Sequence, residues 1–247
     1  MEIQHCIVGK EGVDFGSRVG RPERVHRIRE ELKARGIKKV FLPDCAFTTR
    51  IVELGNNNEE PWGSEVVWTK EKADGVVVSE PNVAVGLCNG DCPAVIIHDT
   101  DTNRLILLHC GTRCLIPKHD DSIILHAFRQ YKLNPKRVRI IVGYGVGPCC
   151  YGIGFLRKII FQVTNFPRTV GLPVPYELKF GVACKGPRRG KTSLDLYNLI
   201  RKQLSWQLEV PRDNIEINDS CTACAGYHSY SYKGKNAGRN LVLAWMA

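Results

Sequence analysis

Two glycine-bearing turns carry the side chains in this chain that could do chemistry. Residues 89–93 read Asn-Gly-Asp-Cys-Pro and follow one apolar run, and His109 ends the next apolar run, four residues before Arg113. Turns of this kind bend the backbone sharply at strand ends, so we expect Cys92 and His109 to share one cleft. A thiol beside an imidazole can hold a metal ion or form a nucleophile and its base. Arg113 adds a fixed cation for an anionic substrate.

The charge of the chain favours small anionic substrates over nucleic acid. The 247 residues carry a formal net charge of +10. The basic residues are spread along the chain with acidic residues between them, and neither a zinc-finger spacing nor an RNA-binding signature with aromatic residues is present. We therefore expect no specific nucleic-acid binding, and we expect the positive field to attract small anions.

The cysteines and the apolar runs indicate a cytoplasmic protein. No apolar run reaches the ~20 residues that a membrane-spanning helix needs, and the first residues lack the pattern of a signal peptide. The eleven cysteines are odd in number and spread over the whole chain. We interpret them as reduced thiols and expect a cytoplasmic location without membrane contact.

Periodicity predicts alternating helices and strands. The first part reads as a helix that begins at Pro22 and ends before Gly36, a strand over 38–42, and a loop over 55–61. Further strands are predicted at 75–79, 83–87, 94–98, 104–109 and 138–144, with a helix over 119–132. The turn at 99–103 joins the third and fourth of these strands as a hairpin.

The C-terminal part continues in the same way. A helix over 154–163, a strand over 177–184, and strands over 214–218 and 240–245 are predicted. Thr192 and Asp195 have the spacing of a capping box, which predicts a helix that begins at residues 192–193. Because no repeat or low-complexity linker interrupts the chain, we expect one domain.

Four segments, in this order, resemble the polyphenol oxidase (laccase-domain) family, whose members are also described as zinc-dependent purine nucleoside phosphorylases. Residues 89–93 are similar to its Thr-Ala-Asp-Cys-Leu-Pro turn, and 109–113 to its His-Ala-Gly-Trp-Arg segment. Residues 147–154 are similar to its Gly-Pro-Cys-Cys-Tyr-Glu-Val-Gly, and 221–239 to its closing Cys-Thr-x-Cys, Ser-Tyr and Gly-Arg. The best match covers 75–247. The resemblance implies a single α+β domain over 1–247, with mixed β-sheet layers flanked by helices.

The resemblance also implies a metal site, with one departure. In the family, zinc is held by a histidine of an early Gln-Val-His-Gly motif and by the residues that match Cys92 and His109. Depending on the alignment, Phe47 or Trp62 stands at the first position, and neither side chain binds a metal. Zinc sites in proteins normally have at least three protein ligands, so zinc would need a third ligand that the sequence does not identify. His228 is one replacement, and copper is not expected.

Purine nucleoside chemistry, by phosphorolysis or deamination, is the first hypothesis that the resemblance implies. The catalytic residues would be Cys92, His109, Arg113 and Asp91, and the partners a nucleoside and phosphate. Arg113 would also bind substrate, together with Tyr151, Tyr232 and Arg239.

Two other functions stay open. The fold also resembles the catalytic part of cytotoxic necrotizing factor toxins, so a metal-free hydrolase or amidase could use the Cys92 thiolate with His109 as its base. Alternatively, the chain is a degenerate member that binds a ligand or partner without turnover.

Other cysteine and glycine patterns have weaker interpretations. Cys88 and Cys92, with Cys110 and Cys114, form two C-x-x-x-C groups that could hold zinc through four thiolates. The Cys221-Thr-Ala-Cys224 segment is interpreted as two structural thiols in a loop. The loop 186–192 has three residues between its glycines, whereas a phosphate-binding P-loop has four.

Overall fold

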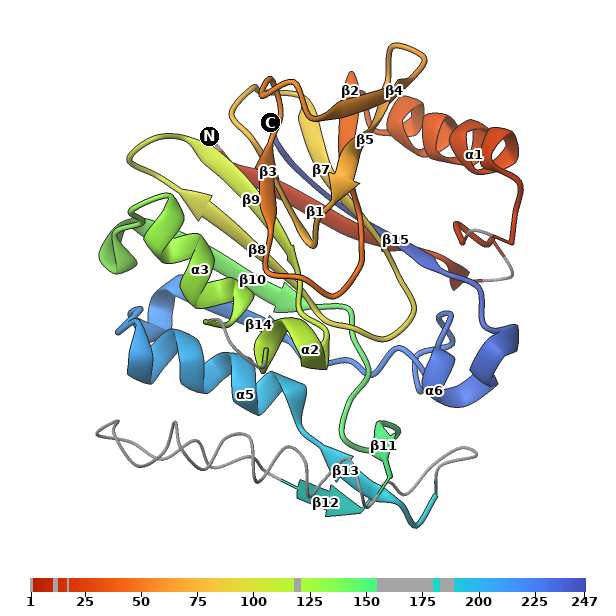
Figure 1. Ribbon diagram of the computed structural model, residues 1–247, viewed down its shortest axis with the longest axis vertical. Helices are drawn as coiled ribbons and strands as arrows, with labels where there is room; N and C mark the ends of the chain where they lie inside the picture. Colours follow the sequence, from red (N-terminus) through yellow and green to blue (C-terminus); the bar gives the residue numbers. More distant parts are fainter. Residues whose placement is uncertain (1, 11–12, 17, 118–120, 155–179, 183–188) are drawn as a thin grey trace.

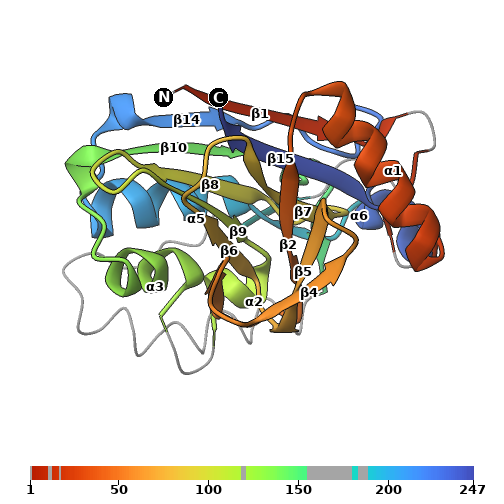
Figure 2. The same ribbon diagram turned by 90° about the horizontal axis from the view of Figure 1, so that it is seen from above.

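The computed structural model describes residues 2–10, 13–16, 18–117, 121–154, 180–182 and 189–247. Two six-stranded sheets lie face to face, with helices on their outer faces (Figures 1 and 2). This is the α+β arrangement of mixed sheet layers and flanking helices that we predicted.

The first sheet has the order β1-β15-β7-β2-β5-β4. Its strands are β1 (Ile3–Val8), β15 (Asn240–Met246), β7 (Val83–Asn89), β2 (Lys39–Asp44), β5 (Val66–Lys72) and β4 (Glu59–Trp62). β2 is parallel to both of its neighbours, and the other pairs are antiparallel. The two ends of the chain pair with one another in this sheet, because β1 lies beside β15.

The second sheet has the order β14-β10-β8-β9-β6-β3. Its strands are β14 (Ile215–Asn218), β10 (Val138–Gly143), β8 (Ala94–Asp99), β9 (Arg104–His109), β6 (Gly75–Val78) and β3 (Ile51–Glu53). β8 and β9 form the predicted hairpin, and β10 is parallel to β14. A short third sheet contains β11 (Gly152–Ile153), β13 (Thr192–Leu194) and β12 (Phe180–Val182).

Alternation along the central strands divides the core into three layers. In β9, Leu105 and Leu107 face the space between the two sheets, and Ile106 and Leu108 face the helices outside the second sheet. Because successive strand residues point to opposite faces, a strand that is covered on both sides is apolar throughout. This explains the unbroken apolar run that precedes His109.

The helices cover the outer faces of the two sheets. α1 (Arg21–Ala34) lies on the first sheet, and α2 (Thr112–Leu115), α3 (Ile123–Gln130) and α5 (Leu196–Lys202) lie on the second (Figure 1). The short helix α6 (Tyr230–Lys233) precedes β15. No helix in the described part of the chain is long and apolar enough to cross a membrane.

Some local predictions are wrong. Thr192 lies in β13 rather than at a helix start, and Asp195 caps α5 by accepting a hydrogen bond from the Asn198 amide at 2.9 Å. The predicted helix over 119–132 is shorter, because Ser122 caps it by accepting a bond from the Leu125 amide. The predicted loop over 55–61 already contains the start of β4. The helix predicted over 154–163 lies outside the described residues, apart from Gly154.

Candidate functional site

The hairpin β8–β9 brings the two predicted site residues to one edge of the second sheet. Ala94 at the start of β8 pairs with His109 at the end of β9, and Cys92 precedes β8 by two residues. The Cys110 amide donates to the Pro93 carbonyl at 2.8 Å, which extends the hairpin beyond its last pair. The turn that carries Cys92 and the end of β9 that carries His109 therefore lie side by side, as predicted from the sequence.

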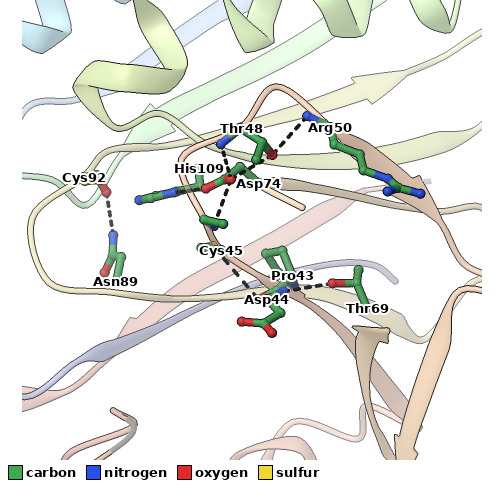
Figure 3. Close-up of polar contacts among 11 residues, drawn as sticks. Pro43, Asp44, Cys45, Thr48, Arg50, Thr69, Asp74, Asn89, Cys92 and His109 are labelled. Carbon is green, nitrogen blue, oxygen red and sulfur yellow. Dashed lines mark hydrogen bonds and ion pairs between the residues drawn. The ribbon is translucent and has the colours of Figure 1, made fainter. Parts of the chain in front are cut away.

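A buried amide holds the turn that carries Cys92. Asn89 is buried, and its Nδ2 donates to the Cys92 carbonyl at 2.8 Å and to the Tyr144 carbonyl at 2.9 Å. The Asn89 side chain thus closes the turn and also connects it to the segment after β10. Figure 3 shows Asn89 beneath this turn.

Asp74 orients His109. Nδ1 of His109 lies 2.6 Å from Oδ1 of Asp74, and the His109 amide donates to the Asp74 carbonyl at 2.7 Å. Both residues are buried. Asp74 immediately precedes β6, which pairs with β9, so the strand register places the carboxylate beside the imidazole (Figure 3).

The other oxygen of Asp74 is held by the segment after β2. Oδ2 accepts hydrogen bonds from the Ala46 amide at 3.1 Å, the Thr48 amide at 2.7 Å and the Thr48 hydroxyl at 3.1 Å. With these donors and the imidazole, the carboxylate is well satisfied in a buried place, as an ionised group must be. Its role is to fix the ring of His109.

Opposing influences act on the pKa values of this pair. Burial raises the pKa of Asp74, but the hydrogen bond and charge of His109 and the amides of Thr48 and Ala46 outweigh it, so the pKa is lowered. Burial disfavours the imidazolium form of His109, but Cys92, Cys45 and Asp74 raise its pKa well above the usual value. The geometry thus favours a carboxylate–imidazolium pair.

Three thiols surround the imidazole. Cys45, which follows β2, and Cys114 in α2 both hydrogen-bond to His109, and Cys92 acts on it through its charge. Burial raises the pKa of Cys45, and raises that of Cys114 to about 11 in spite of the hydrogen bond from His109. Ligand atoms of Cys45, Asp74 and His109 lie within 4.8 Å of one another, a group that could hold a metal ion.

Phe47 lies at the mouth of this group. It is 49% exposed, and its ring centroid lies 5.5 Å from that of His109. A Cβ atom added at Gly111 would lie 3.1 Å from the Cys92 sulfur and 3.3 Å from the Phe47 ring. Gly111 therefore leaves the space in which the thiol and the aromatic ring approach one another.

The backbone of Phe47 is in the left-handed region, with φ of 61°. A bulky residue in this region costs about 1–3 kcal/mol and persists only where its surroundings impose it. The amides of Ala46 and Thr48, on either side, are both bound to Asp74. The carboxylate that orients His109 thus also fixes the exposed ring beside it.

Arg113 lies close to this ring, and Tyr151 contacts the residue before Arg113. The Arg113 guanidinium carbon is 5.7 Å from the centroid of the Phe47 ring. The preceding residue, Thr112, has its Oγ1 2.5 Å from the hydroxyl of Tyr151. Phe47 also lines a depression of about 470 Å³, together with Thr48, Thr49, Arg50, Pro117 and His126.

Asp91 faces the C-terminal segment. Its Oδ1 accepts hydrogen bonds from the hydroxyls of Ser229 at 2.6 Å and Thr222 at 3.2 Å, and its Oδ2 accepts one from the Ser231 amide. Burial raises the pKa of Asp91 although these donors lower it. We assign this carboxylate to anchoring the turn before Cys92.

The remaining predicted residues lie with the C-terminal segment. Tyr232 is exposed on α6, and the Arg239 amide donates to Asp14 at 2.7 Å. The Arg239 side chain donates to the carbonyls of Ala237 and Gly238. His228 binds the Val13 carbonyl through Nε2 at 3.0 Å. Nothing in these contacts joins the three residues to the imidazole of His109.

Sequence reasoning missed Cys45 and Asp74. Each stands at a strand end, Cys45 after β2 and Asp74 before β6, which is the position that singled out Cys92 and His109. The four cysteines of the two C-x-x-x-C groups do not lie together: Cys88 packs on the α1 side of the first sheet, Cys110 and Cys114 pack outside the second sheet, and Cys92 lies beside Gly111.

The fold is that of three solved bacterial proteins. YlmD of Geobacillus stearothermophilus superposes with a TM-score of 0.75 at 20% identity, covering 99% of this chain and 92% of that one. YfiH of Bacillus licheniformis gives 0.74 at 18% identity, with 99% and 93% covered. A Neisseria meningitidis protein gives 0.70 at 21% identity, with 99% and 94% covered.

The family model described as multi-copper polyphenol oxidoreductase laccase matches residues 10–247. The chain therefore belongs to this family. Two curated relatives are named purine nucleoside phosphorylases: YlmD of G. stearothermophilus, 22% identical over 173 residues, and a Clostridium acetobutylicum protein, 23% identical over 171 residues. The matches cover 70% and 68% of this chain, and 59% and 64% of those relatives.

Proposed function

We propose that this chain acts on purine nucleosides at the group formed by Cys92, His109, Phe47 and Arg113, which we call the cleft, and that substrate reaches it from the depression that Phe47 lines. The observation that carries the proposal is the buried Asp74–His109 pair, which holds one imidazole in a fixed orientation among thiols and beside an exposed aromatic ring. The names of the two curated relatives support the substrate class. A cytoplasmic location is part of the proposal, because reduced thiols persist there.

Each residue has a task that its surroundings suit. Phe47 offers an aromatic face on which a purine ring can stack, and Arg113 beside it offers a fixed cation for phosphate. His109, with its raised pKa, holds a proton that it can give to the departing purine nitrogen. In phosphorolysis the bond from C1′ to the base nitrogen breaks while a bond from C1′ to a phosphate oxygen forms.

The donors of the cleft also suit zinc. Asp74 binds Nδ1 of His109 and leaves Nε2 available, the arrangement in which a carboxylate orients a zinc-bound histidine. Cys45 and His109 belong to a group whose ligand atoms lie within 4.8 Å of one another, and Cys92, which lies outside that group, would have to move toward it to complete the ligand set. Zinc would supply a Lewis acid that polarises an attacking oxygen. In the zinc-bound state His109 could no longer donate this proton, and water or phosphate would be the proton donor instead.

A product assay tests the proposal. Purified protein is incubated with adenosine, inosine or guanosine, with and without phosphate, and the bases and nucleosides are separated by chromatography. Phosphate-dependent release of base with ribose 1-phosphate is the expected result, and inosine from adenosine would mark deamination instead. The absence of both products with zinc-loaded protein would contradict the proposal.

Matched variants connect the activity to the cleft. Cys92→Ala should lose the activity, whereas Cys88→Ala should keep it, because Cys88 packs on the α1 side of the first sheet. Equal activity in both variants would place the reaction elsewhere.

A metal-free cysteine hydrolase is the second candidate. It is favoured by one observation, the orientation of His109 by Asp74, which is the base and orienting group that a nucleophilic thiol needs. Thiolate Cys92 would attack a carbonyl carbon, and the leaving group would take the proton from His109.

Alkylation separates the two candidates. In the hydrolase, Cys92 of chelator-treated protein should react with iodoacetamide faster than the other thiols, and His109→Ala should remove this advantage. In a zinc enzyme, the metal should instead protect Cys92 until chelator is added. Mapping the alkylated peptides by mass spectrometry gives both results.

A further inference from the structure

Outside the cleft, a second group of cysteines lies where two loops meet. Cys149 and Cys150 lie in the turn between β10 and β11, and Cys221 and Cys224 lie in the loop between β14 and α6. β10 and β14 are parallel neighbours, and Gly143 pairs with Asn218 at their ends. Both loops therefore leave the sheet at the same edge, which brings residues more than seventy positions apart into contact.

The spacing of the sulfur atoms fits one metal ion. All four Sγ atoms lie within 4.8 Å of one another, with Cys224 3.7 Å from Cys149 and 3.6 Å from Cys150. A Zn–S bond of about 2.3 Å implies tetrahedral S–S separations of about 3.8 Å. A disulfide requires about 2.05 Å, so these sulfur atoms are in contact without being bonded.

The backbone of both loops is shaped for this contact. Cys221-Thr-Ala-Cys224 has the two-residue spacing of zinc-binding turns, and the Ala225 amide closes the turn on the Cys221 carbonyl at 2.9 Å. In the other loop, the Cys150 amide donates to the Gly147 carbonyl at 3.1 Å. A Cβ at Gly147 would lie 3.1 Å from the Cβ of Cys221 and 3.4 Å from the Cys149 sulfur.

The local core consists largely of these cysteines. Among the residues that the structure describes, the buried cluster here contains only Val146, Cys150 and Cys221, with Cys149, Tyr151 and Ala223 against it. Three of these six residues are cysteines, so a metal ion bound to them would add directly to the contacts that order the two loops.

We propose that Cys149, Cys150, Cys221 and Cys224 bind one structural Zn²⁺ as a four-thiolate site, separate from the cleft. Four S–H groups release their protons to solvent and four Zn–S bonds form, with no change of oxidation state. The site is closed, because four protein ligands fill the tetrahedral coordination and leave no position for water or substrate. It does not rest on the proposed nucleoside chemistry.

The site would also position the cleft. Thr222, between the two cysteines of the second loop, donates to the Asp91 carboxylate through its hydroxyl and to the Gly145 carbonyl through its amide. The Val146 amide, near the first pair, donates to the Asp91 carbonyl at 2.7 Å. Asp91 precedes Cys92, so loss of the ion should loosen the Cys92 turn.

Metal analysis of variants tests the proposal. Protein purified without chelator is analysed for zinc per chain in three pairs of substitutions: Cys221→Ser with Cys224→Ser, Cys45→Ser with Cys92→Ser, and Cys6→Ser with Cys88→Ser. The first pair should lose one zinc ion that both other pairs retain. Cobalt-substituted protein should show the sulfur-to-cobalt charge-transfer absorption of a four-thiolate site, which only the first pair removes.

A measurement on the unmodified chain covers the case in which the first variant fails to fold. Cys224 is exposed, so as an ordinary thiol it would react readily with iodoacetamide. All four cysteines should instead be protected in zinc-loaded protein and become reactive when a chelator removes the ion. Alkylation of Cys224 before chelation, unchanged zinc in the first variant pair, or a disulfide among the four residues would overturn the proposal.

Discussion

The two cysteine groups differ in the side chains that lie beside their sulfur atoms. In the cleft, Cys45 lies with the imidazole of His109 and the carboxylate of Asp74, and the exposed ring of Phe47 lies beside them. In the loop group, four thiols lie within 4.8 Å of one another, and the group contains neither an imidazole nor a carboxylate. Both groups bring together residues that lie near strand ends, so position alone does not distinguish them.

The comparison teaches that the mixture of donors, more than their number, indicates the role. Four thiolates saturate zinc and give a closed site, whereas three ligands leave a position for a reacting oxygen. An imidazole held by a carboxylate can in addition carry a proton. The cleft therefore has the features of a reactive site, and the loop group those of a structural one.

Replacing His109 should have the largest effect on activity. A small effect would contradict the assignment of the cleft as the reactive site. His109→Ala removes the proton carrier and one metal donor, so kcat/KM should fall by about 10²–10⁴-fold. The Cys221→Ser and Cys224→Ser pair should act mainly on stability, which thermal unfolding monitors. If the loop variant lost as much activity as His109→Ala while remaining folded and rich in cleft metal, the loop group would itself belong to the reaction.

Asp74→Asn tests how much the charge of the Asp74–His109 pair contributes to stability. Breaking a buried ion pair costs about 3–5 kcal/mol, so the variant should unfold at lower urea concentration. The lowered pKa of Asp74 stabilises the fold above its unfolded value of about 4, and this contribution is lost as the pH falls through the folded value. The raised pKa of His109 stabilises the fold below about 6.5, and this contribution is lost as the pH rises through the folded value.

The difference in unfolding free energy between wild type and Asp74→Asn should therefore be largest between about pH 4 and 6.5. Urea titrations of both proteins from below about pH 4 to above about pH 6.5, under identical metal-free conditions, measure it. A difference that does not change with pH would show that Asp74 contributes only uncharged hydrogen bonds.

Most of the two central sheets was predictable, because local patterns specify them. The strands at 75–79, 83–87, 94–98 and 104–109 are confirmed, since their residues are apolar on both faces and are separated by turns. β1 escaped notice because its partial burial leaves a weak pattern and its order comes from pairing with β15. The prediction of a helix start at Thr192 was wrong because a capping-box spacing also occurs where a strand runs directly into a helix.

The cleft was half predictable. Cys92 and His109 stand in turns with recognisable sequences, but Asp74 reaches His109 only through the pairing of β6 with β9. Cys45 comes from a third segment, which follows β2 of the other sheet. Contacts of this kind depend on tertiary register, which a single sequence does not reveal.

Phe47 offers a milder test of the cleft. Phe47→Ala should raise KM for a nucleoside by about 2–10-fold, because an aromatic stacking contact contributes about 0.5–1.5 kcal/mol. Phe47→Tyr keeps the ring and should keep KM close to the wild-type value. Equal KM values for wild type and Phe47→Ala would show that the purine binds away from this ring.

The smallest expected effect concerns Tyr151, and it decides how far the cleft extends. Tyr151→Phe removes the 2.5 Å hydrogen bond to Thr112, worth about 0.5–1.5 kcal/mol, and so loosens the start of α2, where Arg113 lies. Because only part of this energy would reach Arg113, KM for phosphate should rise by about 2-fold, with little change in kcat. Tyr232→Phe is the matched control, because Tyr232 is exposed on α6 among the C-terminal contacts. Initial rates at varied phosphate concentration compare the two variants. A larger effect of Tyr232→Phe would show that the substrate site extends to α6, in the C-terminal segment that contacts Asp91.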